Sequence, residues 1–540
     1  MKKSYILAVI VQIIFMAVYY YFVLPPINVH SMEFWSFVMI SLAVFAGLCA
    51  FCYYGSEVMY IRSKKTRKNL TKAPLFIMVP VIGTLVIVVG ITVLNFFYSP
   101  LFNAKSYSQR ITVDQTAVFT DDFKEVDFDA LPLLDRVSSE KLGDRVMGQM
   151  SELVSQYYVS DQYTQINYND KIVRVTPLEY ADFIKWFTNR KEGVKGFITV
   201  NSVDGNSELT KMDKGMKYMP SAYFNENLYR QLRFQYPTET FGEVTFEIDN
   251  EGKPFWIATT YDYTAVGLKA RVSGVVILDP VTGESKKYDI KDVPTWVDNA
   301  YCAELLIEQV DNWGMYKGGY WNSIFGQKNV VNTTDGYNYL AMNDDIYLYT
   351  GITSVLADES NLGFVLSNMR TGETKMYSVA GAEEYSAMAS AEGQVQQMGY
   401  ISTFPLLINL NNKPTYLVSL KDAAGLVKMY GFVDVADYQK VVVSDASKGI
   451  EAAAQNYLNS YAEEINSDII NKKEITIKKI TSATKKGNTY YYVTDELNKK
   501  YVLSIELGDE LAFVSAGDKL HIGYYDSNDE IIEVIKLIKE

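Results

Sequence analysis

Three long apolar stretches without a charged residue crowd into the first hundred residues, and no other feature constrains the chain as strongly. They cover residues 5–24, 34–54 and 75–97. A helix rises about 1.5 Å per residue, so about 20 apolar residues cross the hydrocarbon core of a bilayer. The sequence therefore predicts a membrane anchor of three transmembrane helices over residues 1–105. A cleaved signal peptide is the alternative for the first stretch, but Leu24-Pro25-Pro26 lacks the small residues of a cleavage site.

The basic residues that flank these stretches predict how the anchor crosses the membrane. Lys2 and Lys3 precede the first stretch, and six lysines and arginines lie between residues 62 and 72, whereas residues 25–32 carry none. Short loops rich in lysine and arginine stay cytoplasmic. We therefore expect the N-terminus and residues 60–74 to be cytoplasmic and residues 98–540 to be extracytoplasmic, with membrane lipids around residues 5–97. The basic loop could also contact anionic lipids.

Charge and cysteine usage constrain the outer body. The first 105 residues hold nine of the 51 lysines and arginines and two of the 64 acids, which leaves residues 106–540 with a formal charge of −20. Such an acidic body disfavours nonspecific binding to nucleic acid or anionic polymers unless a local basic patch overrides it. Cys49 and Cys52 lie inside the second apolar stretch, where packing is the better interpretation. Cys302 is alone in the outer body, which excludes a disulfide framework and fits a bacterial envelope protein.

Four segments of the outer body share a pattern of a glycine, an apolar strand, a turn and a polar strand. They begin at Gly196, Gly274, Gly363 and Gly431. Thr-Gly-Glu at 282–284 and 371–373 is typical of a tight hairpin turn in which glycine takes a positive φ, and Asp-Gly-Asn occupies 204–206. We expect helices between the hairpins, over residues 297–310 and 382–398. The pattern predicts repeated α+β modules over residues 191–445, with chance similarity between short strands as the alternative.

These modules resemble PepSY-type domains, which occur in extracellular protease propeptides and bacterial envelope proteins. The resemblance rests on Gly274-Val-Val-Ile-Leu-Asp279-Pro-Val-Thr-Gly283-Glu284 and on the preceding Lys253-Pro254-Phe255-Trp256, and it covers residues 190–440. The whole chain also resembles a group of multi-span membrane proteins of Gram-positive bacteria. Both resemblances imply a cell-envelope setting, and neither supplies an activity or a functional residue.

A connector, residues 106–190, precedes the modules. We expect one helix over residues 132–159. A second is expected to begin at Thr176-Pro177-Leu178-Glu179, where threonine and glutamate form a capping box around a proline at the first helical position, and to continue through Phe187. The acidic residues 121–129 lack the spacing of a calcium loop, so a solvated strand or linker is expected there.

The C-terminal region is predicted to be a separate small β-barrel. A linking helix over residues 446–470 leads to residues 471–540, where short strands alternate with polar turns. This pattern is typical of an OB-like or SH3-like barrel. OB folds can bind single-stranded nucleic acid, but outside the membrane we expect no nucleic-acid partner. The predicted fold class is α+β: three N-terminal transmembrane helices, tandem PepSY-like modules and a small barrel.

Motifs for catalysis are sparse. His30 and His521 are the two histidines, so no histidine pair can form a zinc site. The sequence contains no phosphate-binding loop, nucleophile elbow or dinucleotide fingerprint. We therefore expect no enzymatic activity, no cofactor and no metal site. A pair of carboxylates, as in a glycan hydrolase, stays open because acids are frequent and their distances are unknown.

One aromatic segment is the candidate binding site. It carries Trp313, Tyr316, Tyr320 and Trp321, interleaved with glycines that let a ligand approach the backbone. Exposed rings of this kind bind sugars or peptide partners. Packing between the modules is the alternative interpretation. The downstream acids Asp335, Asp344 and Asp345 could contact a cation or form an acidic loop.

Three functions are compatible with these features. The leading hypothesis is a non-enzymatic, membrane-anchored envelope protein whose outer modules bind or regulate another envelope component, either a protein or a cell-wall polymer. The second is an accessory subunit of a membrane transport or secretion complex, with the spans packed against partner helices. The third is a carboxylate-dependent envelope glycan hydrolase. The spans hold no ionisable residue in their interiors, which disfavours a transport core.

Overall fold

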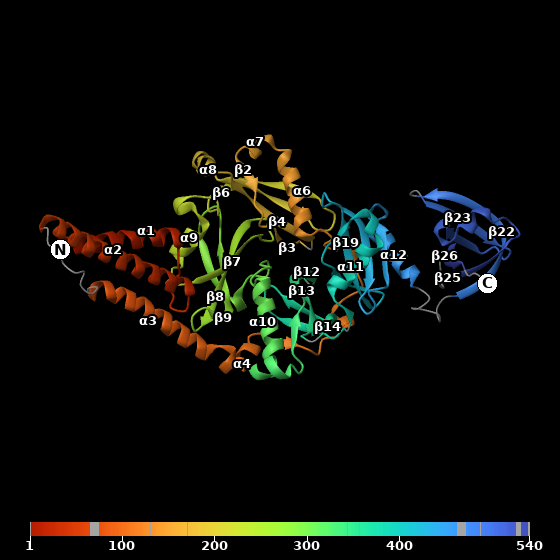
Figure 1. Cartoon of the computed structure of the whole chain (residues 1–540). Coiled ribbons are helices and arrows are strands. Elements are labelled where there is room, and N and C mark those ends of the chain that lie inside the picture. Colours follow the sequence, from red (N-terminus) through yellow and green to blue (C-terminus); the bar gives the residue numbers. More distant parts are fainter. Residues whose placement is uncertain are drawn as a thin grey trace. The chain divides into compact units, whose positions relative to one another are not determined.

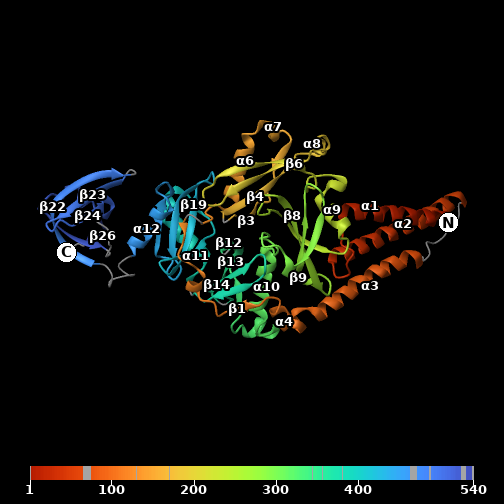
Figure 2. The same ribbon diagram turned by 180° about the vertical axis from the view of Figure 1, so that it is seen from behind.

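The protein has a mixed α+β fold with three N-terminal apolar helices (Figures 1 and 2). The structure is a computed structural model that describes residues 2–64, 75–128, 131–169, 171–342, 344–355, 357–379, 381–461, 471–485, 488–524 and 531–537. The chain forms two compact units. The first contains Met1–Met388, Thr403–Tyr416 and Ala424–Leu426, and the second contains Ala389–Ser402, Leu417–Ala423 and Val427–Glu540.

The three predicted spans form helices α1 (Lys2–Val23), α2 (Met32–Lys64) and α3 (Leu75–Tyr98). Each is long and apolar enough to cross a membrane, which confirms this part of the prediction. Most of the basic loop predicted to be cytoplasmic, residues 65–74, lies outside the described residues.

Hydrogen bonds join the ends of the spans to the body of the first unit. The Arg233 Nε–H donates to the Leu24 carbonyl at 2.8 Å, and the Asn95 side-chain amide donates to the Val266 carbonyl at 2.9 Å. The Ile27 amide donates to the Pro237 carbonyl at 2.7 Å. These bonds come from both the first interhelical loop and the end of α3, so the body is fixed to its anchor at more than one point.

The first sheet has the order β2-β4-β5-β6, with β3 paired to β4. Its elements are α6 (Arg136–Gly148), α7 (Ser151–Val154), β2 (Tyr157–Val159), β3 (Thr164–Tyr168), β4 (Lys171–Tyr180), α8 (Phe183–Asn189), β5 (Val194–Asn201) and β6 (Ser207–Met216). Asp135 caps α6 by accepting a hydrogen bond from the Ser138 amide. The single helix predicted over residues 132–159 is therefore wrong after Gly148, because α7 and then β2 follow.

The helix predicted to begin at Thr176 is also wrong. Residues 171–180 form strand β4, in which Pro177 lies opposite Phe197 of β5. Every residue from Ile172 to Tyr180 is buried. Burial in a central strand therefore stabilises this segment more than a helix with a capping box would. Helix α8 begins after Asp182, whose side chain caps it instead.

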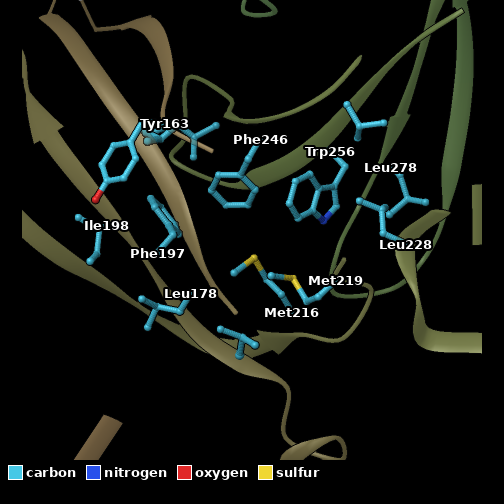
Figure 3. Close-up of a cluster of buried hydrophobic side chains, with 14 of the residues drawn as sticks. Tyr163, Leu178, Phe197, Ile198, Met216, Met219, Leu228, Phe246, Trp256 and Leu278 are labelled. Atoms are coloured by element: carbon cyan, nitrogen blue, oxygen red, sulfur yellow. The ribbon is translucent and has the colours of Figure 1, made fainter. Parts of the chain in front are cut away.

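The second sheet is an antiparallel meander with the order β10-β9-β8-β7. Helix α9 (Leu228–Gln235) precedes β7 (Thr240–Ile248), β8 (Pro254–Thr264), β9 (Leu268–Leu278) and β10 (Ser285–Asp289). Its inner face shares one hydrophobic core with the first sheet (Figure 3). The ring of Phe246 lies 5.8 Å from that of Phe197 and 5.1 Å from that of Trp256. Burial of these large side chains ties the two sheets together.

The third sheet has the order β1-β15-β14-β13-β11, with β12 on β13 and β16 on β14. Its elements are α4 (Pro100–Ser108), β1 (Val113–Asp114), α5 (Phe119–Asp122), α10 (Ala303–Tyr316), η4 (Asn322–Gly326), β11 (Val331–Thr333), β12 (Asn338–Met342), β13 (Asp345–Ser354), β14 (Ala357–Asn368), β15 (Thr374–Tyr377) and β16 (Gly381–Ala382). Strand β1 comes from the connector and pairs in parallel with β15. The connector thus runs from the end of α3 directly into this sheet.

The helix predicted over residues 297–310 begins six residues later, at Ala303. The amides of Asp298 and Asn299 donate to the Glu247 carboxylate, and those of Ala300 and Tyr301 donate to the Met369 carbonyl. These four amides therefore donate to acceptors far away in the sequence and do not need hydrogen bonds within a helix. The helix begins only after Cys302.

A fourth sheet and a closed barrel complete the chain. The sheet has the order β17-β19-β20-β21 with β18 on β19, and the barrel the order β22-β23-β24-β26-β25. The sheet elements are α11 (Glu384–Gln394), η5 (Gln396–Met398), β17 (Ile401–Ser402), β18 (Leu406–Leu410), β19 (Lys413–Lys421), β20 (Val427–Asp434), β21 (Val441–Asp445) and α12 (Ile450–Ser460). The barrel strands are β22 (Asn471–Lys485), β23 (Asn488–Asp495), β24 (Lys500–Ser504), β25 (Lys519–Tyr524) and β26 (Ile531–Leu537). Residues 462–470 of the predicted linking helix lie outside the described residues.

The four segments predicted to be repeats all fold as antiparallel hairpins with similar turns. At each turn an Asn or Asp side chain accepts hydrogen bonds from amides two and three residues further on; these residues are Asn201, Asp279, Asn368 and Asp434. A Cβ on Gly274 would lie 2.0 Å from the Tyr288 carbonyl oxygen, and one on Gly363 would lie 2.2 Å from that of Tyr377. The matching glycines are therefore required by the close approach of the neighbouring strand.

Candidate functional site

A groove of about 590 Å³ opens in the first unit between the segment after α3 and the C-terminal end of α10. We call it the α4–α10 groove. Its lining residues come from these two segments alone: Lys105, Ser108, Gln109, Ile111, Thr112, Val113, Trp313, Tyr316, Lys317 and Gly319. The groove therefore begins within ten residues of the end of the third span.

The aromatic wall of the groove is positioned by the core of the third sheet. Leu306, Val310 and Trp313 follow one another at helical spacing on α10 and are buried together in that core. Tyr316, one turn further along, packs edge-on against Tyr107 of α4, with ring centres 6.0 Å apart. This spacing turns Trp313 and Tyr316 toward the connector, where they line the groove.

The groove is basic although the body is acidic. Two of its lining residues are lysines, Lys105 and Lys317, and none is an aspartate or glutamate. Within the described part of the chain neither ammonium group is in an ion pair, and both residues are exposed. The Lys317 ammonium lies 4.5 Å from the centre of the Trp313 ring, and partial desolvation by its neighbours lowers the pKa of this lysine. The groove thus presents two cations and the Tyr316 ring to a ligand, with the largely buried Trp313 forming part of its wall.

The structure separates the four predicted site residues into two pairs. Trp313 and Tyr316 line the groove, and Trp313 is also part of the core, as the packing interpretation predicts. Tyr320 and Trp321 lie beyond the groove, and Trp321 stacks on Phe325 with the rings 5.8 Å apart and 13° from parallel. Trp321 is 62% exposed and Phe325 is 77% exposed, so this second pair forms an aromatic surface of its own.

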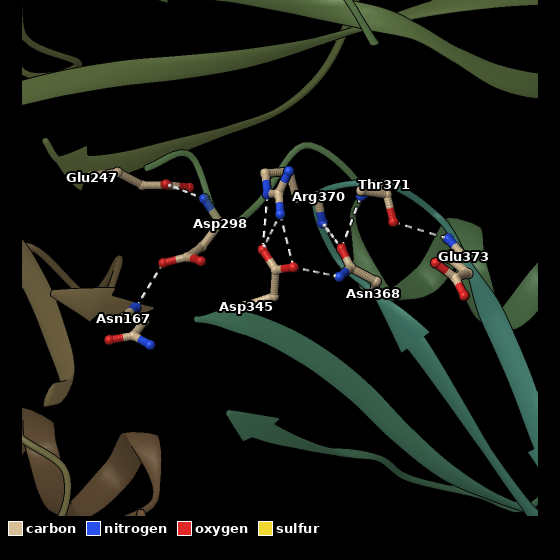
Figure 4. Close-up of polar contacts among 8 residues, drawn as sticks. All are labelled: Asn167, Glu247, Asp298, Asp345, Asn368, Arg370, Thr371 and Glu373. Carbon is tan, nitrogen blue, oxygen red and sulfur yellow. Dashed lines mark hydrogen bonds and ion pairs between the residues drawn. The ribbon is translucent and has the colours of Figure 1, made fainter. Parts of the chain in front are cut away.

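A polar seam of two separate hydrogen-bonded groups lies where elements of the first three sheets meet (Figure 4). Glu247 of β7 accepts a hydrogen bond from the Asp298 amide at 2.9 Å, and the Asp298 carboxylate accepts one from the Asn167 amide of β3 at 2.6 Å. Burial raises the pKa of both acids, and the charge of Glu247 raises that of Asp298 further. Both side chains are fully buried, so a polymeric substrate cannot reach them.

Asp345 belongs to the same seam. It forms an ion pair with Arg370 and accepts a hydrogen bond from the Asn368 side chain at 2.8 Å (Figure 4). Sequence reasoning placed Asp345 among acids that could contact a cation, but its carboxylate is buried and already paired. Asp344 and Asp345 therefore do not act together as an exposed acidic loop.

One group of potential metal donors was missed by the sequence analysis. Single ligand atoms of Glu243, Cys302 and Glu304 lie within 4.8 Å of one another. The Tyr261 hydroxyl lies 3.2 Å from the Cys302 sulfur, and burial raises the pKa of the thiol and of Glu243. A thiolate and carboxylates suit a borderline metal such as zinc, but the raised pKa values oppose the deprotonated forms that a metal needs. Cys302 and Glu304, at the start of α10, instead share hydrogen bonds with the hydroxyls of Tyr261 and Tyr337.

No protein-family model matches this chain, and no curated protein matches its sequence.

Proposed function

We propose that this protein is a non-enzymatic, membrane-anchored protein of a bacterial cell envelope that binds or regulates another envelope component through the α4–α10 groove. One observation carries the proposal: two lysines that form no ion pair with any described residue line a groove without acids, beside two aromatic residues and shortly after the third span, on a body whose formal charge is −20. The distribution of basic residues around the spans supports an extracytoplasmic position for residues 98–540.

The chemistry of the groove favours a partner that carries carboxylates or phosphates. Ammonium groups attract such anions, and tyrosine and tryptophan add apolar contact area at little conformational cost. The negative charge of the body as a whole disfavours nonspecific binding of anionic proteins and polymers, so a local basic region is needed to hold them. An acidic segment of another envelope protein and an anionic cell-wall polymer share this chemistry.

The remaining modules fit an interaction role. Helices followed by antiparallel meanders support the interpretation of residues 191–445 as PepSY-like modules, and the closed five-stranded barrel supports an OB-like or SH3-like domain at residues 471–540. The bonds between the spans and the body favour a fixed platform over a body on a flexible tether. The burial of Glu247 and Asp298 disfavours these acids as a hydrolase pair.

Site-specific photocrosslinking would test this function. A photoreactive amino acid replaces Tyr316 in the full-length protein in native membranes, and captured material is identified by mass spectrometry. Phe513, which is 85% exposed on the barrel, carries the same group in the control. We expect a product from position 316 that is absent from position 513 and that is lost when Lys105→Glu and Lys317→Glu are combined. Equal capture at both positions, or no effect of the charge reversal, would contradict the proposal.

A further inference from the structure

Four apolar side chains stand exposed beside the first span. Ile184, Phe187 and Phe224 are 67%, 58% and 56% exposed, and the Phe183 ring lies 6.2 Å from that of Phe187 and 6.4 Å from that of Phe224. We call these four residues, on α8 and at the start of η2 (Phe224–Glu226), the α8–η2 patch. A contiguous apolar surface of this kind marks a site of interaction with a protein or a membrane.

Buried contacts hold the patch in place. Trp186 of α8 is fully buried beneath these rings, with its own ring 5.5 Å from that of Phe183 and 5.7 Å from that of Phe224, and its indole N–H donates to Glu226 at 2.8 Å. Phe224 has a φ of 54°, a left-handed conformation that a bulky residue adopts only at an energetic cost. The fold therefore positions these rings outward, and their exposure is not the fraying of a loose end.

Arg230 connects the patch to the end of the first span. Its guanidinium donates to the Phe224 carbonyl and to the Tyr21 carbonyl, and it lies 4.0 Å from the centre of the Tyr21 ring. Tyr21 lies in the last turn of α1, and Phe22 beside it is also exposed. Figures 1 and 2 show α8 at the end of the first unit from which α1 extends. The patch thus continues the apolar surface of α1 onto the body.

The charges around α8 suit lipid headgroups. Lys185, Arg190 and Lys191 lie within or directly after the helix, and the Arg190 guanidinium lies 5.4 Å from the centre of the Phe187 ring. The neighbouring acids are engaged: Asp182 caps α8, and Glu192 pairs with Lys195 at 2.6 Å. Aromatic rings next to lysine and arginine are typical of segments that lie in the membrane interface, where the cations reach phosphates.

We propose that the α8–η2 patch inserts into the headgroup region of the leaflet next to the body, so that the lipid bilayer is its partner. The body then rests on the membrane beside α1 and is not held only by its bonds to the spans. This inference depends on α1 spanning a bilayer, but it is independent of what the α4–α10 groove binds.

Fluorescence quenching by lipids tests the inference on the full-length protein. Cys49, Cys52 and Cys302 are replaced by alanine, and Ile184→Cys, Phe187→Cys or, as the control, Leu362→Cys on β14 is labelled with an environment-sensitive dye. Each variant is reconstituted into vesicles of phosphatidylcholine and phosphatidylglycerol with nitroxide groups near the headgroups. We expect quenching at positions 184 and 187 to exceed that at position 362 about twofold or more, because only an inserted dye meets the nitroxides.

Two results would overturn the inference. In the first, positions 184 and 187 are quenched no more than position 362 and are freely reached by iodide in the water. In the second, they are shielded from both quenchers, and the shielding rises with the protein-to-lipid ratio, which would identify a second copy of this chain as the partner. Melting of each variant, followed by the fluorescence of the buried Trp186 and Trp256, verifies that the body is folded.

Discussion

The Glu247 carboxylate accepts the hydrogen bond of the Asp298 backbone amide at 2.9 Å, and so two fully buried acids are held side by side at the junction of three sheets. Burial raises the pKa of both groups, and the charge of Glu247 also raises that of Asp298. An acid whose folded pKa lies above its unfolded value costs no stability at low pH and destabilises the fold as pH rises toward the folded pKa.

Asp298→Asn is therefore expected to stabilise the protein at high pH and to have little effect at low pH. Asparagine keeps an oxygen that can accept the hydrogen bond from the Asn167 amide and removes the charge next to Glu247. We expect a gain of roughly 1 to 3 kcal/mol at pH 8 that shrinks toward pH 4. Thermal unfolding across this pH range measures it. Asp204→Asn, at an exposed turn, is the matched control, and a benefit of Asp298→Asn that did not vary with pH would refute this account.

Glu179 is expected to make the stability of the structure around it depend on pH as well. It is buried on β4 and accepts hydrogen bonds from the amide and the hydroxyl of Ser221. Burial raises its pKa from 4.5 to about 7, the nearby charge of Asp161 adds to this, and the bonds from Ser221 oppose it. A shift of this size corresponds to at most about 3 kcal/mol of unfolding free energy. This stability is lost as pH rises from 4.5 through 7.

Hydrogen–deuterium exchange around Tyr180 and Ser221 measures this effect. Corrected for intrinsic rates, protection of these amides is expected to fall between pH 5 and pH 8 in the wild type. Glu179→Gln keeps an oxygen for the Ser221 amide and should make protection independent of pH. If the variant retained the wild-type pH profile, another group would have to be responsible.

Alanine at the matching glycines of two hairpins should be costly. A Cβ on Gly274 or Gly363 would lie 2.0 or 2.2 Å from a carbonyl oxygen of the paired strand, so the backbone must move. We expect Gly274→Ala to destabilise the protein by roughly 1 to 3 kcal/mol, measured as a lower melting temperature. Gly393→Ala in α11 is the control. A Cβ there has no neighbour within 4 Å, and a stabilisation of about 0.5 to 1 kcal/mol is expected. If Gly274→Ala and the wild type had equal melting temperatures, the two strands would be able to move apart without an energetic cost, and this account would be wrong.

Local patterns predicted well what depends on local chemistry. The apolar stretches correspond to α1, α2 and α3, and the Thr-Gly-Glu turns join antiparallel strands. The predictions are wrong where contacts with residues distant in the sequence determine the secondary structure. Thr176 and Pro177 enter a buried strand although they form a helix signal, and α10 begins late because Glu247, 51 residues before Asp298, satisfies the amides ahead of it.

The candidate site was predicted only in part. Trp313 and Tyr316 were singled out because glycines and rings stand out in the sequence, whereas Lys105 was assigned to the anchor and Lys317 was not considered. Their shared groove depends on the packing of α4 against α10, which no periodicity in either segment reveals. Lys105, shortly after the third span, and Lys317, within the aromatic segment, were the signals in the sequence that could have indicated it.

Arg233 is expected to be the strongest single link between the body and the anchor. It is almost fully buried, donates hydrogen bonds to the carbonyls of Leu24, Tyr236 and Glu239, and lies over the Phe241 ring. Arg233→Met keeps much of the apolar volume but leaves these carbonyls without their donor, so we expect a loss of about 2 to 4 kcal/mol.

Arg271→Met, in the same sheet as Phe241, is the matched control, because Arg271 is 76% exposed and its pair with Asp262 at 3.3 Å contributes little. Limited proteolysis of both variants in lipid vesicles separates the two expectations. The segment around Leu24 to His30 should become cleavable in Arg233→Met and stay resistant in Arg271→Met. If both stayed resistant, the remaining bonds of Asn95 and Ile27 would suffice to hold the body to its spans.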